Sequence, residues 1–332
     1  MNNDTQTDAL FERATTTTQR LFEALQGIIR GRDDTLRLLL TALIADGHVL
    51  LEDYPGSGKT TLTKALGKLI AKDASESSEE HIRSFRRIQF TPDMLPGDVL
   101  GVNIFEPRTG QFRFMHGPVF AYVVLADEIN RTGPKVQAAF LECMAEKQVT
   151  IDNVTYPLDE LFFVVGTQNP LDIAGTYPLP LVQLDRFLLK LPMAYVDAAV
   201  ELEILESHHS IRENLDTLTP VSTRNEVLGA RAAARAVHIS PSLRNAIVAL
   251  VQSTRSNPTL QYGASTRAAI MLQEAMRAWA LINRRTYCSE DDLKTLAPYV
   301  LLHRLAFRGI SESPREALLG LLEPVIERLI RA

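Results

Sequence analysis

A glycine-rich loop, DYPGSGKT at residues 53–60, is the first feature of the sequence that could do chemistry. Gly56 and Gly58 permit backbone angles that turn N–H groups inward, where they can cradle phosphate oxygens. Lys59 is placed to reach the β- and γ-phosphates of a nucleotide, and the Thr60 hydroxyl to ligate Mg²⁺. The predicted phosphate-binding residues are Asp53, Tyr54, Pro55, Gly56, Ser57, Gly58, Lys59, Thr60 and Thr61.

An acidic pair, Asp127 and Glu128, follows an apolar run farther along the chain. Asp127 suits a magnesium ion that is held through its water ligands. Glu128 suits a general base that polarises a water for in-line attack on the γ-phosphate. Such a pair alone is more often a helix cap or a solvated turn. Combined with the phosphate loop, it predicts hydrolysis of ATP with Mg²⁺ rather than phosphoryl transfer to another acceptor.

A third polar group, Asn169 in the segment GTQNP, stands at the end of the next apolar run. Its amide could hold the attacking water or contact the γ-phosphate. Asn-Pro is also a common turn initiator, so the catalytic interpretation depends on the two preceding motifs.

Alternating strand and helix patterns surround these motifs and predict how they are positioned. Strands are expected at 48–52, 86–90, 122–127, 161–166 and 187–191. Helical spacing of apolar residues marks 8–30, 33–45, the segment after the phosphate loop, and 134–146. Such alternation is typical of an α/β fold with a mainly parallel sheet and helices on both faces.

Beyond about residue 195 the strand pattern fades and helical faces dominate. The sequence therefore predicts two domains, an α/β domain at 1–194 and a helical domain at 195–332.

The composition narrows the class of protein. The 332 residues include 35 Lys and Arg against 40 Asp and Glu, a net charge of −5, which argues against a general binder of the nucleic-acid backbone. Charges interrupt every apolar run before the roughly 18 residues that a membrane-spanning helix needs. The polar N-terminus lacks the apolar stretch of a signal peptide, and Cys143 and Cys288 show no metal-binding spacing. A cytoplasmic location is expected.

These motifs, in this order, resemble the AAA+ ATPases and, within them, the MoxR family. The resemblance covers about residues 25–332, and its most specific stretches are LLEDYPGSGKT, RIQFTPDMLPGDVLG, HGPVF, LADEINR, GTYPLP and QLDRFLLKL. Asp53, in place of the first glycine of the generic phosphate loop, is typical of MoxR proteins. The resemblance implies a P-loop three-layer sandwich with a mainly parallel five-stranded sheet, followed by a small all-α lid domain.

The resemblance also implies roles for individual residues. Asn169 corresponds to sensor 1, Arg186 to an arginine finger that reaches the nucleotide of a neighbouring protomer, and Arg267 to sensor 2, which the lid places on the γ-phosphate. A guanidinium at either position would stabilise charge on the transferring phosphoryl group. Ile28 and Ile29 match the hydrophobic seat of the adenine, although core packing explains them equally well.

An arginine finger supplied by a neighbour requires a homo-oligomer, and the family implies a ring that is usually a hexamer. Arg131 could also act across that interface, or form an ordinary surface ion pair. Two segments, 101–117 and 147–160, resemble hairpin inserts that face the ring pore or the substrate in related AAA+ proteins. Simple extensions of a sheet are the alternative interpretation of both.

Four residues depart from the family pattern. Leu181 and Val182 stand where an acidic residue and an alanine are usual, and Gly133 and Thr266 each replace a proline. None of these changes removes a chemical group from the ATP site, so they bear on the partner and the interface rather than on hydrolysis.

The function implied by the resemblance is a chaperone-like ATPase that remodels a partner protein during assembly, maturation or metal insertion. In the family that partner is often a protein with a von Willebrand factor A domain. Two alternatives stay open. A nucleic-acid motor could use Arg108, Phe112, Arg113 and Phe114 of the insert, although the acidic composition makes nucleic acid the less expected partner. A non-hydrolysing nucleotide switch would be expected to lack Glu128 or one of the sensor residues.

Overall fold

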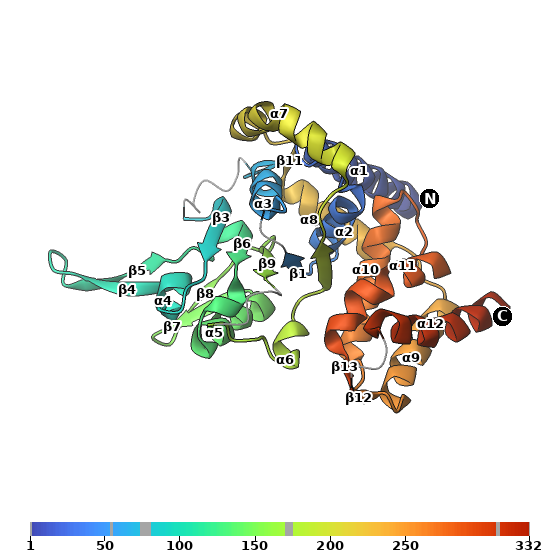
Figure 1. Cartoon of the computed structure of the whole chain (residues 1–332). Helices are drawn as coiled ribbons and strands as arrows, with labels where there is room; N and C mark the ends of the chain where they lie inside the picture. The colour runs from blue at the N-terminus through green and yellow to red at the C-terminus, as the bar shows by residue number, and fades with distance from the viewer. Residues whose placement is uncertain (1, 54–55, 74–80, 170–174, 310–312, 332) are drawn as a thin grey trace.

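Five parallel strands form the central sheet of the computed structural model, which describes residues 2–53, 56–73, 81–169, 175–309 and 313–331. Their order across the sheet is β10 (Leu189–Met193), β1 (Val49–Asp53), β9 (Phe163–Gln168), β6 (Ala121–Asp127) and β3 (Arg83–Gln89). Every neighbouring pair in this order is parallel. The predicted five-stranded parallel sheet is therefore confirmed (Figure 1).

Alternate strand residues point to opposite faces of the sheet, so the α/β part has three layers. Leu51 and Val165 belong to one hydrophobic cluster, and Leu50 and Val164 to the other. The helices that contribute to the first cluster include α1 (Asn2–Gln26), α2 (Asp33–Ile44), α3 (Lys59–Lys68) and α8 (Arg224–Ala236), and the cluster continues into the other helices of the C-terminal region. The helices of the second cluster are α4 (Pro96–Leu100) and α5 (Pro134–Glu146).

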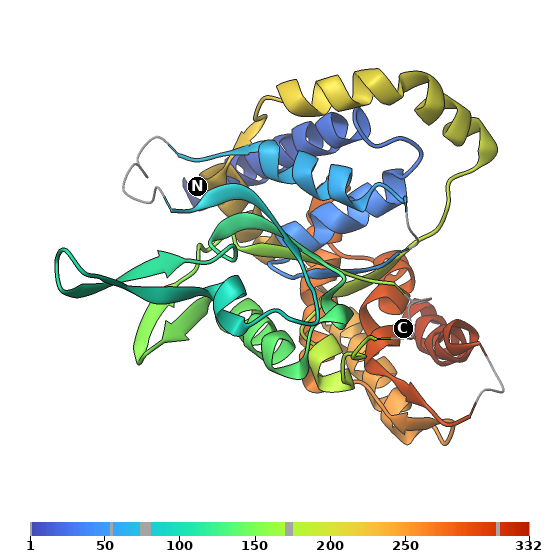
Figure 2. The same cartoon turned by 60° about the vertical axis from the view of Figure 1, so that its left-hand side comes forward.

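Both expected hairpins are present. One pairs β4 (Gly101–Glu106) with β5 (Gln111–His116), and the other pairs β7 (Gln148–Ile151) with β8 (Val154–Pro157), each antiparallel. Figure 2 shows the β4–β5 hairpin projecting away from the body of the molecule.

The C-terminal region is mainly helical, as predicted. Its helices are α7 (Ala198–Thr217), α8, α9 (Pro241–Ser256), α10 (Thr266–Ile282), α11 (Glu290–Leu301), the 3₁₀ turn η2 (Leu302–Arg304) and α12 (Pro314–Arg331). Three short strands interrupt it: β11 (Ser222–Thr223), β12 (Leu260–Tyr262) and β13 (Ala306–Phe307). β11 pairs with β2 (Ile70–Ala71), and β12 pairs with β13. Strands of two or three residues are too short to leave an alternating pattern in the sequence.

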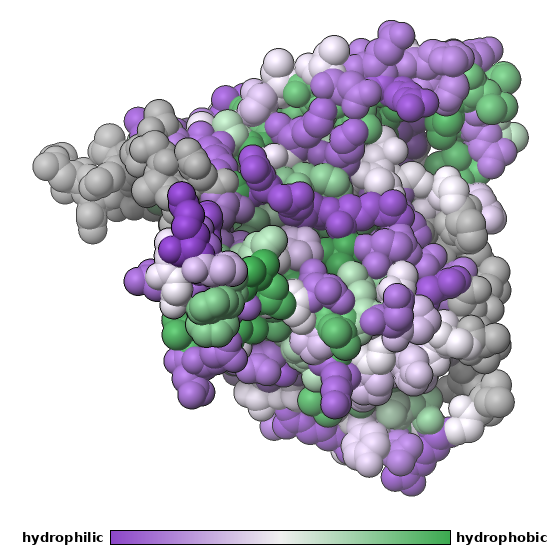
Figure 3. Space-filling view, turned by 90° about the vertical axis from the view of Figure 1, so that its left-hand side faces the viewer, coloured by the Kyte–Doolittle hydropathy of each residue, from purple (hydrophilic) through white to green (hydrophobic). Residues whose placement is uncertain are grey.

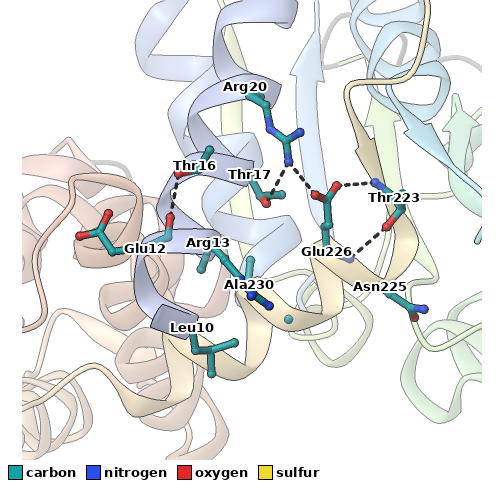
Figure 4. Close-up of a pocket in the computed structure, with 12 residues that line it drawn as sticks. Leu10, Glu12, Arg13, Thr16, Thr17, Arg20, Thr223, Asn225, Glu226 and Ala230 are labelled. Carbon is teal, nitrogen blue, oxygen red and sulfur yellow. Dashed lines mark hydrogen bonds and ion pairs between the residues drawn. The ribbon is translucent and has the colours of Figure 1, made fainter. Parts of the chain in front are cut away.

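Helix α8 packs against α1, beside a cleft of about 690 Å³. Figure 4 shows Arg20 of α1 directed at Glu226 of α8, with Arg20 Nη2 2.8 Å from Glu226 Oε1. Glu226 also completes a capping box with Thr223 at the start of α8. Farther along the helix, Arg231 is buried and donates to the backbone carbonyl of Leu43 in α2. The first part of the C-terminal region thus packs on the α/β part, and the boundary at 194/195 stays a prediction.

Candidate active site

The phosphate loop connects the end of β1 to the start of α3. Gly56 has φ +84° and Gly58 has φ +88°, and a Cβ added at either position would meet nothing within 4 Å. The left-handed backbone, rather than a lack of space, therefore requires glycine at these positions. Ser57 is buried, and the N-terminus of α3 follows directly, where backbone N–H groups can bind an anion.

The other predicted loop residues divide into two groups. Lys59, Thr60 and Thr61 form the first turn of α3 and are half-buried. The side chain of Asp53, together with Tyr54 and Pro55, lies outside the described residues.

Asp127, at the end of β6, is the most strongly held carboxylate of the site. Its Oδ1 lies 3.1 Å from Lys59 Nζ and accepts a 2.8 Å hydrogen bond from the Thr167 hydroxyl. Its Oδ2 lies 2.6 Å from Arg87 Nη2. Burial alone would raise the pKa of Asp127, but the bonds from Arg87 and Thr167 and the charge of Lys59 together lower the pKa below its ordinary value. Asp127 is therefore a stable anion, as a magnesium site needs.

Glu128 follows Asp127 in a left-handed conformation, with φ +57° and ψ +49°. Residues with side chains seldom adopt this region, and it is common at functional sites. The Glu128 N–H donates to Thr167 Oγ1 at 2.9 Å, which joins both acidic residues to one hydroxyl. Its carboxylate Oε2 lies 2.9 Å from Gln89 Nε2 and 2.9 Å from Arg131 Nε. The predicted base thus has a defined position within one chain.

Asn169 lies directly after β9, which stands between β1 and β6 in the sheet. Because the strands are parallel, their carboxyl ends share one edge. The sheet order therefore brings the half-buried Asn169 between the phosphate loop and the acidic pair.

A cavity of about 390 Å³ opens beside the phosphate loop. Ile28 and Ile29 line it together with residues of the loop, Gly56, Ser57, Gly58 and Thr61. Its opposite wall comes from α7 and the segment before it, including Tyr195, Ile204 and Leu205. An apolar cavity next to a phosphate loop has the character of a nucleoside site.

The structure does not bring Arg186 and Arg267 to this site. Arg186 follows α6 (Leu181–Leu184), is half-buried and donates to the Leu141 carbonyl at 2.5 Å. Arg267 is exposed in the first turn of α10. In Figure 1, β12, which directly precedes α10, lies near the lower edge, whereas α3 lies in the upper part of the view, below α7. Within the described residues, no hydrogen bond or ion pair joins either arginine to the phosphate loop.

Three residues of the site were missed in the sequence. Arg87 and Gln89 alternate along β3 and reach Asp127 and Glu128 respectively. Their alternation at the end of a strand was a visible signal. Thr167 lies inside the segment GTQNP, but only Asn169 was singled out there, because the link from Thr167 to both acidic residues depends on the order of the strands.

Comparison with known families and proteins agrees with this geometry. Residues 48–189 match the ATPase family associated with various cellular activities (AAA), and residues 252–318 match the AAA lid domain. Chaperone MoxR1 of Mycobacterium tuberculosis is 34% identical over 298 residues, which cover 87% of this chain and 75% of that protein. The chain belongs to the MoxR family of AAA+ ATPases.

Two other relatives extend the match over nearly the whole chain. The uncharacterized protein YeaC of Bacillus subtilis is 42% identical over 320 residues, 93% of this chain and 95% of that protein. A candidate ATPase from Cytophaga hutchinsonii, known from its crystal structure, superposes with a TM-score of 0.86 at 36% identity and covers 96% of this chain and 97% of its own. The predicted AAA+ fold with a helical lid is thereby confirmed. Within the described ranges, no helix is both long and apolar enough to cross a membrane.

Proposed function

We propose that this MoxR-family protein hydrolyses ATP in a Mg²⁺-dependent reaction. The observation that carries the proposal is the bonded set of Lys59, Asp127, Thr167 and Glu128 at the carboxyl edge of the sheet. Every member of the set has the residue type that γ-phosphate chemistry needs. A nucleotide switch would not require the positioned carboxylate of Glu128.

The residues present fit both ATP and Mg²⁺, which the reaction needs. The cavity lined by Ile28 and Ile29 would take the adenosine, and the loop from Gly56 to Thr61 its phosphates. Thr60 and Asp127 offer the oxygen ligands that Mg²⁺ prefers, directly or through water. A magnesium ion bound there would neutralise charge on the β- and γ-phosphates.

Side chains would carry out the proton transfer, orient the water and stabilise the charge of the phosphates. Glu128 would take the proton of the attacking water, while Gln89 and Arg131 hold its carboxylate in place. Asn169 would orient that water or sense the γ-phosphate. Lys59 would stabilise the negative charge of the phosphates.

We infer that Arg186 and Arg267 serve the ATP site of a neighbouring copy in a ring, for which a hexamer is the expected form. Both arginines lie away from their own phosphate loop, and neither has a carboxylate partner among the described residues. This modifies the role implied by the resemblance for Arg267, because its position favours the neighbour's γ-phosphate over its own.

The test of hydrolysis compares Glu128→Gln with Lys59→Ala, and uses Glu142→Gln, an exposed residue of α5, as the matched control. Glu128→Gln should lower kcat by about 10²–10⁴-fold and leave ATP binding intact. Lys59→Ala should weaken ATP binding itself. Steady-state phosphate release and fluorescent-nucleotide titration measure the two effects. A Glu128→Gln protein with the wild-type rate would contradict the assignment, and a wild type that binds ATP without hydrolysis would favour a switch.

We further propose that the β4–β5 hairpin faces a protein client, as a chaperone-like role requires. Ile104, Phe105, Phe112 and Met115 are between 46% and 71% exposed, although such side chains are normally buried. Figure 3 looks onto this end of the molecule and shows hydrophobic side chains gathered beside a hydrophilic band.

A cavity of about 590 Å³ lies between the same hairpin and the beginning of β3. Its charged walls are mainly basic, with Arg83, Arg86 and Arg113 against Glu106. This charge balance suits a client segment that is both apolar and acidic. A protein with a von Willebrand factor A domain is the proposed client, and metal insertion or complex maturation the proposed outcome.

The client test uses Phe105→Ala combined with Phe112→Ala, with Val248→Ala, an exposed residue of α9, as the control. The double variant should lose binding of a purified A-domain protein at least tenfold in calorimetry and keep its basal ATPase rate. Undiminished binding by the double variant would overturn the hairpin assignment, while loss of the basal rate would mean that the hairpin supports the ATP site.

A further inference from the structure

Arg304, in η2, joins the lid to the segment that carries Arg186. Its guanidinium lies 2.7 Å from Asp185 Oδ1 and donates to the carbonyls of Asp185 at 3.1 Å, Phe187 at 2.6 Å and Leu188 at 3.3 Å. The neighbouring His303 ring contacts the same Phe187 carbonyl at 3.0 Å. One side chain of the lid therefore binds four acceptors within residues 185–188, on both sides of Arg186.

The same guanidinium also meets the helix that carries Arg267. Arg304 Nη2 contacts Met271 Sδ at 2.8 Å, and the charge of Arg267 lies near enough to influence Arg304. Arg267 and Met271 are four residues apart on α10, so they share one helix face. Arg304 thus lies between the two elements that carry the predicted trans-acting arginines.

Stability alone is a weak explanation for this arrangement. The Arg304 side chain is only 2% exposed, and a buried ion pair is often no more stabilising than apolar residues of the same size. Burial lowers the pKa of Arg304 to about 10, with Asp185 opposing the shift, so the group stays charged at neutral pH. Several hydrogen bonds from one guanidinium fix the orientation of a segment more closely than apolar packing does.

We propose that Arg304 is a positioning residue, which holds the 185–188 segment and the start of α10 together so that Arg186 and Arg267 enter a neighbour's ATP site as one unit. The proposal rests on the ring proposed above. It assigns the lid of one protomer to the catalytic site of the next.

Mixed assemblies of two inactive variants can test this. An Arg186→Ala subunit keeps its own Glu128 but offers no finger, and a Glu128→Gln subunit offers a finger but cannot hydrolyse ATP. The two are mixed as dissociated chains and then concentrated. The mixture should regain ATPase activity, because the intact Arg186 of one subunit serves the intact Glu128 of the other.

The informative partner is the Glu128→Gln subunit that also carries Arg304→Gln. We expect it to restore less than a tenth of the activity restored by Glu128→Gln alone, with unchanged ATP affinity at its own site and equal incorporation into the assembly. Arg304→Lys should restore an intermediate activity, because it keeps the charge opposite Asp185 and loses the hydrogen bonds of the guanidinium. Asp185→Asn, which leaves all backbone acceptors in place, provides a milder second variant and should also restore less than Glu128→Gln alone.

Arg285→Gln in the same Glu128→Gln subunit is the matched control. Arg285 forms another lid ion pair, 2.5 Å from Asp292, and has no bond to residues 185–188. Full rescue by the Arg304→Gln subunit, or equal losses with Arg285→Gln, would overturn the positioning role while the ring stands. Failure of Glu128→Gln and Arg186→Ala to complement each other would overturn both the trans finger and this proposal.

Discussion

Two groups of functional residues are held in different ways. We call Lys59, Asp127, Glu128 and Thr167 the phosphate side, and Arg186 and Arg267 the arginine side. On the phosphate side, Lys59, Arg87 and Thr167 all bond to the Asp127 carboxylate, within one chain. On the arginine side, Arg186 is bonded to one backbone carbonyl among the residues that the structure describes, and Arg267 is exposed beside the like charge of Arg304.

This difference supports the proposal that one part of the catalytic site is formed within a single chain and that a neighbouring copy supplies the other part. A carboxylate that accepts several hydrogen bonds from its own chain keeps its position whether or not a ligand is bound. Arginines without an anionic partner are suited to bind phosphate oxygens that another molecule supplies. Under this proposal, the complete ATP site is shared between two copies of the chain.

The largest expected effect comes from Arg186→Ala on the arginine side. Loss of an arginine finger typically lowers kcat by about 10³–10⁵-fold, and we expect a loss at the lower end of that range. ATP affinity should change little, because the phosphate side is intact. Phosphate-release assays on the assembled protein measure the effect, with Arg244→Ala, an exposed arginine of α9, as control. A wild-type kcat in Arg186→Ala would contradict the claim that the arginine side contributes to catalysis.

A smaller effect is expected from Thr167→Val on the phosphate side. The variant keeps the shape of the side chain and removes the hydroxyl that joins Asp127 to the Glu128 backbone. We expect kcat to fall about tenfold, the equivalent of roughly 1.4 kcal/mol and one lost charge-assisted hydrogen bond. Thr167→Ser, which retains the hydroxyl, should keep most of the rate. Equal rates in the Val and Ser variants would show that the internal bonds do not position the base.

The smallest expected effect concerns His303 and the free energy of unfolding at acidic pH. Burial, with the nearby charge of Arg304, holds the pKa of His303 well below its ordinary 6.5. Below pH 6.5 the unfolded chain therefore takes up a proton that the folded chain refuses, and the free energy of unfolding falls as the pH falls. The depressed pKa of Asp127, by contrast, matters only near and below its ordinary value of 3.8.

Denaturant unfolding at pH 7, 6 and 5 measures this contrast. His303→Gln should reduce the loss of stability between pH 7 and 5, whereas Asp127→Asn should leave that loss unchanged. His48, buried with a pKa of about 4, accounts for part of the remaining slope. If the free energy of unfolding of His303→Gln depended on pH as that of the wild type does, His303 would not stay neutral in the folded protein.

Local patterns in the sequence were enough to place the residues of the phosphate side at the ends of strands. The loop around Lys59, the acidic pair and Asn169 each follow an apolar strand, so their shared edge could be expected before the strand order was known. The strand expected at 86–90 in fact begins at Arg83. Its first residues are polar because β3 is an edge strand, and they do not show the apolar run of a buried strand.

Contacts between distant segments could not be predicted in the same way. Gln89 meets Glu128 only because β3 is placed beside β6, and Arg304 meets Asp185 across more than a hundred residues. The direction in which the lid carries Arg267 depends on how α10 packs, which no local pattern encodes. The alternation of Arg87 and Gln89 marked two polar side chains at the end of a strand, but the groups that they contact became clear only from the fold, and Arg304 had no such local signal.

The central claim, that the ATP site is shared between copies, is tested most directly by the specific ATPase activity across a range of protein concentrations. Sedimentation in the same samples gives the fraction of assembled chains. We predict that activity per chain rises in parallel with that fraction and is close to zero for dissociated chains. Dissociated chains as active as assembled ones would contradict the claim and place a complete catalytic site in a single copy.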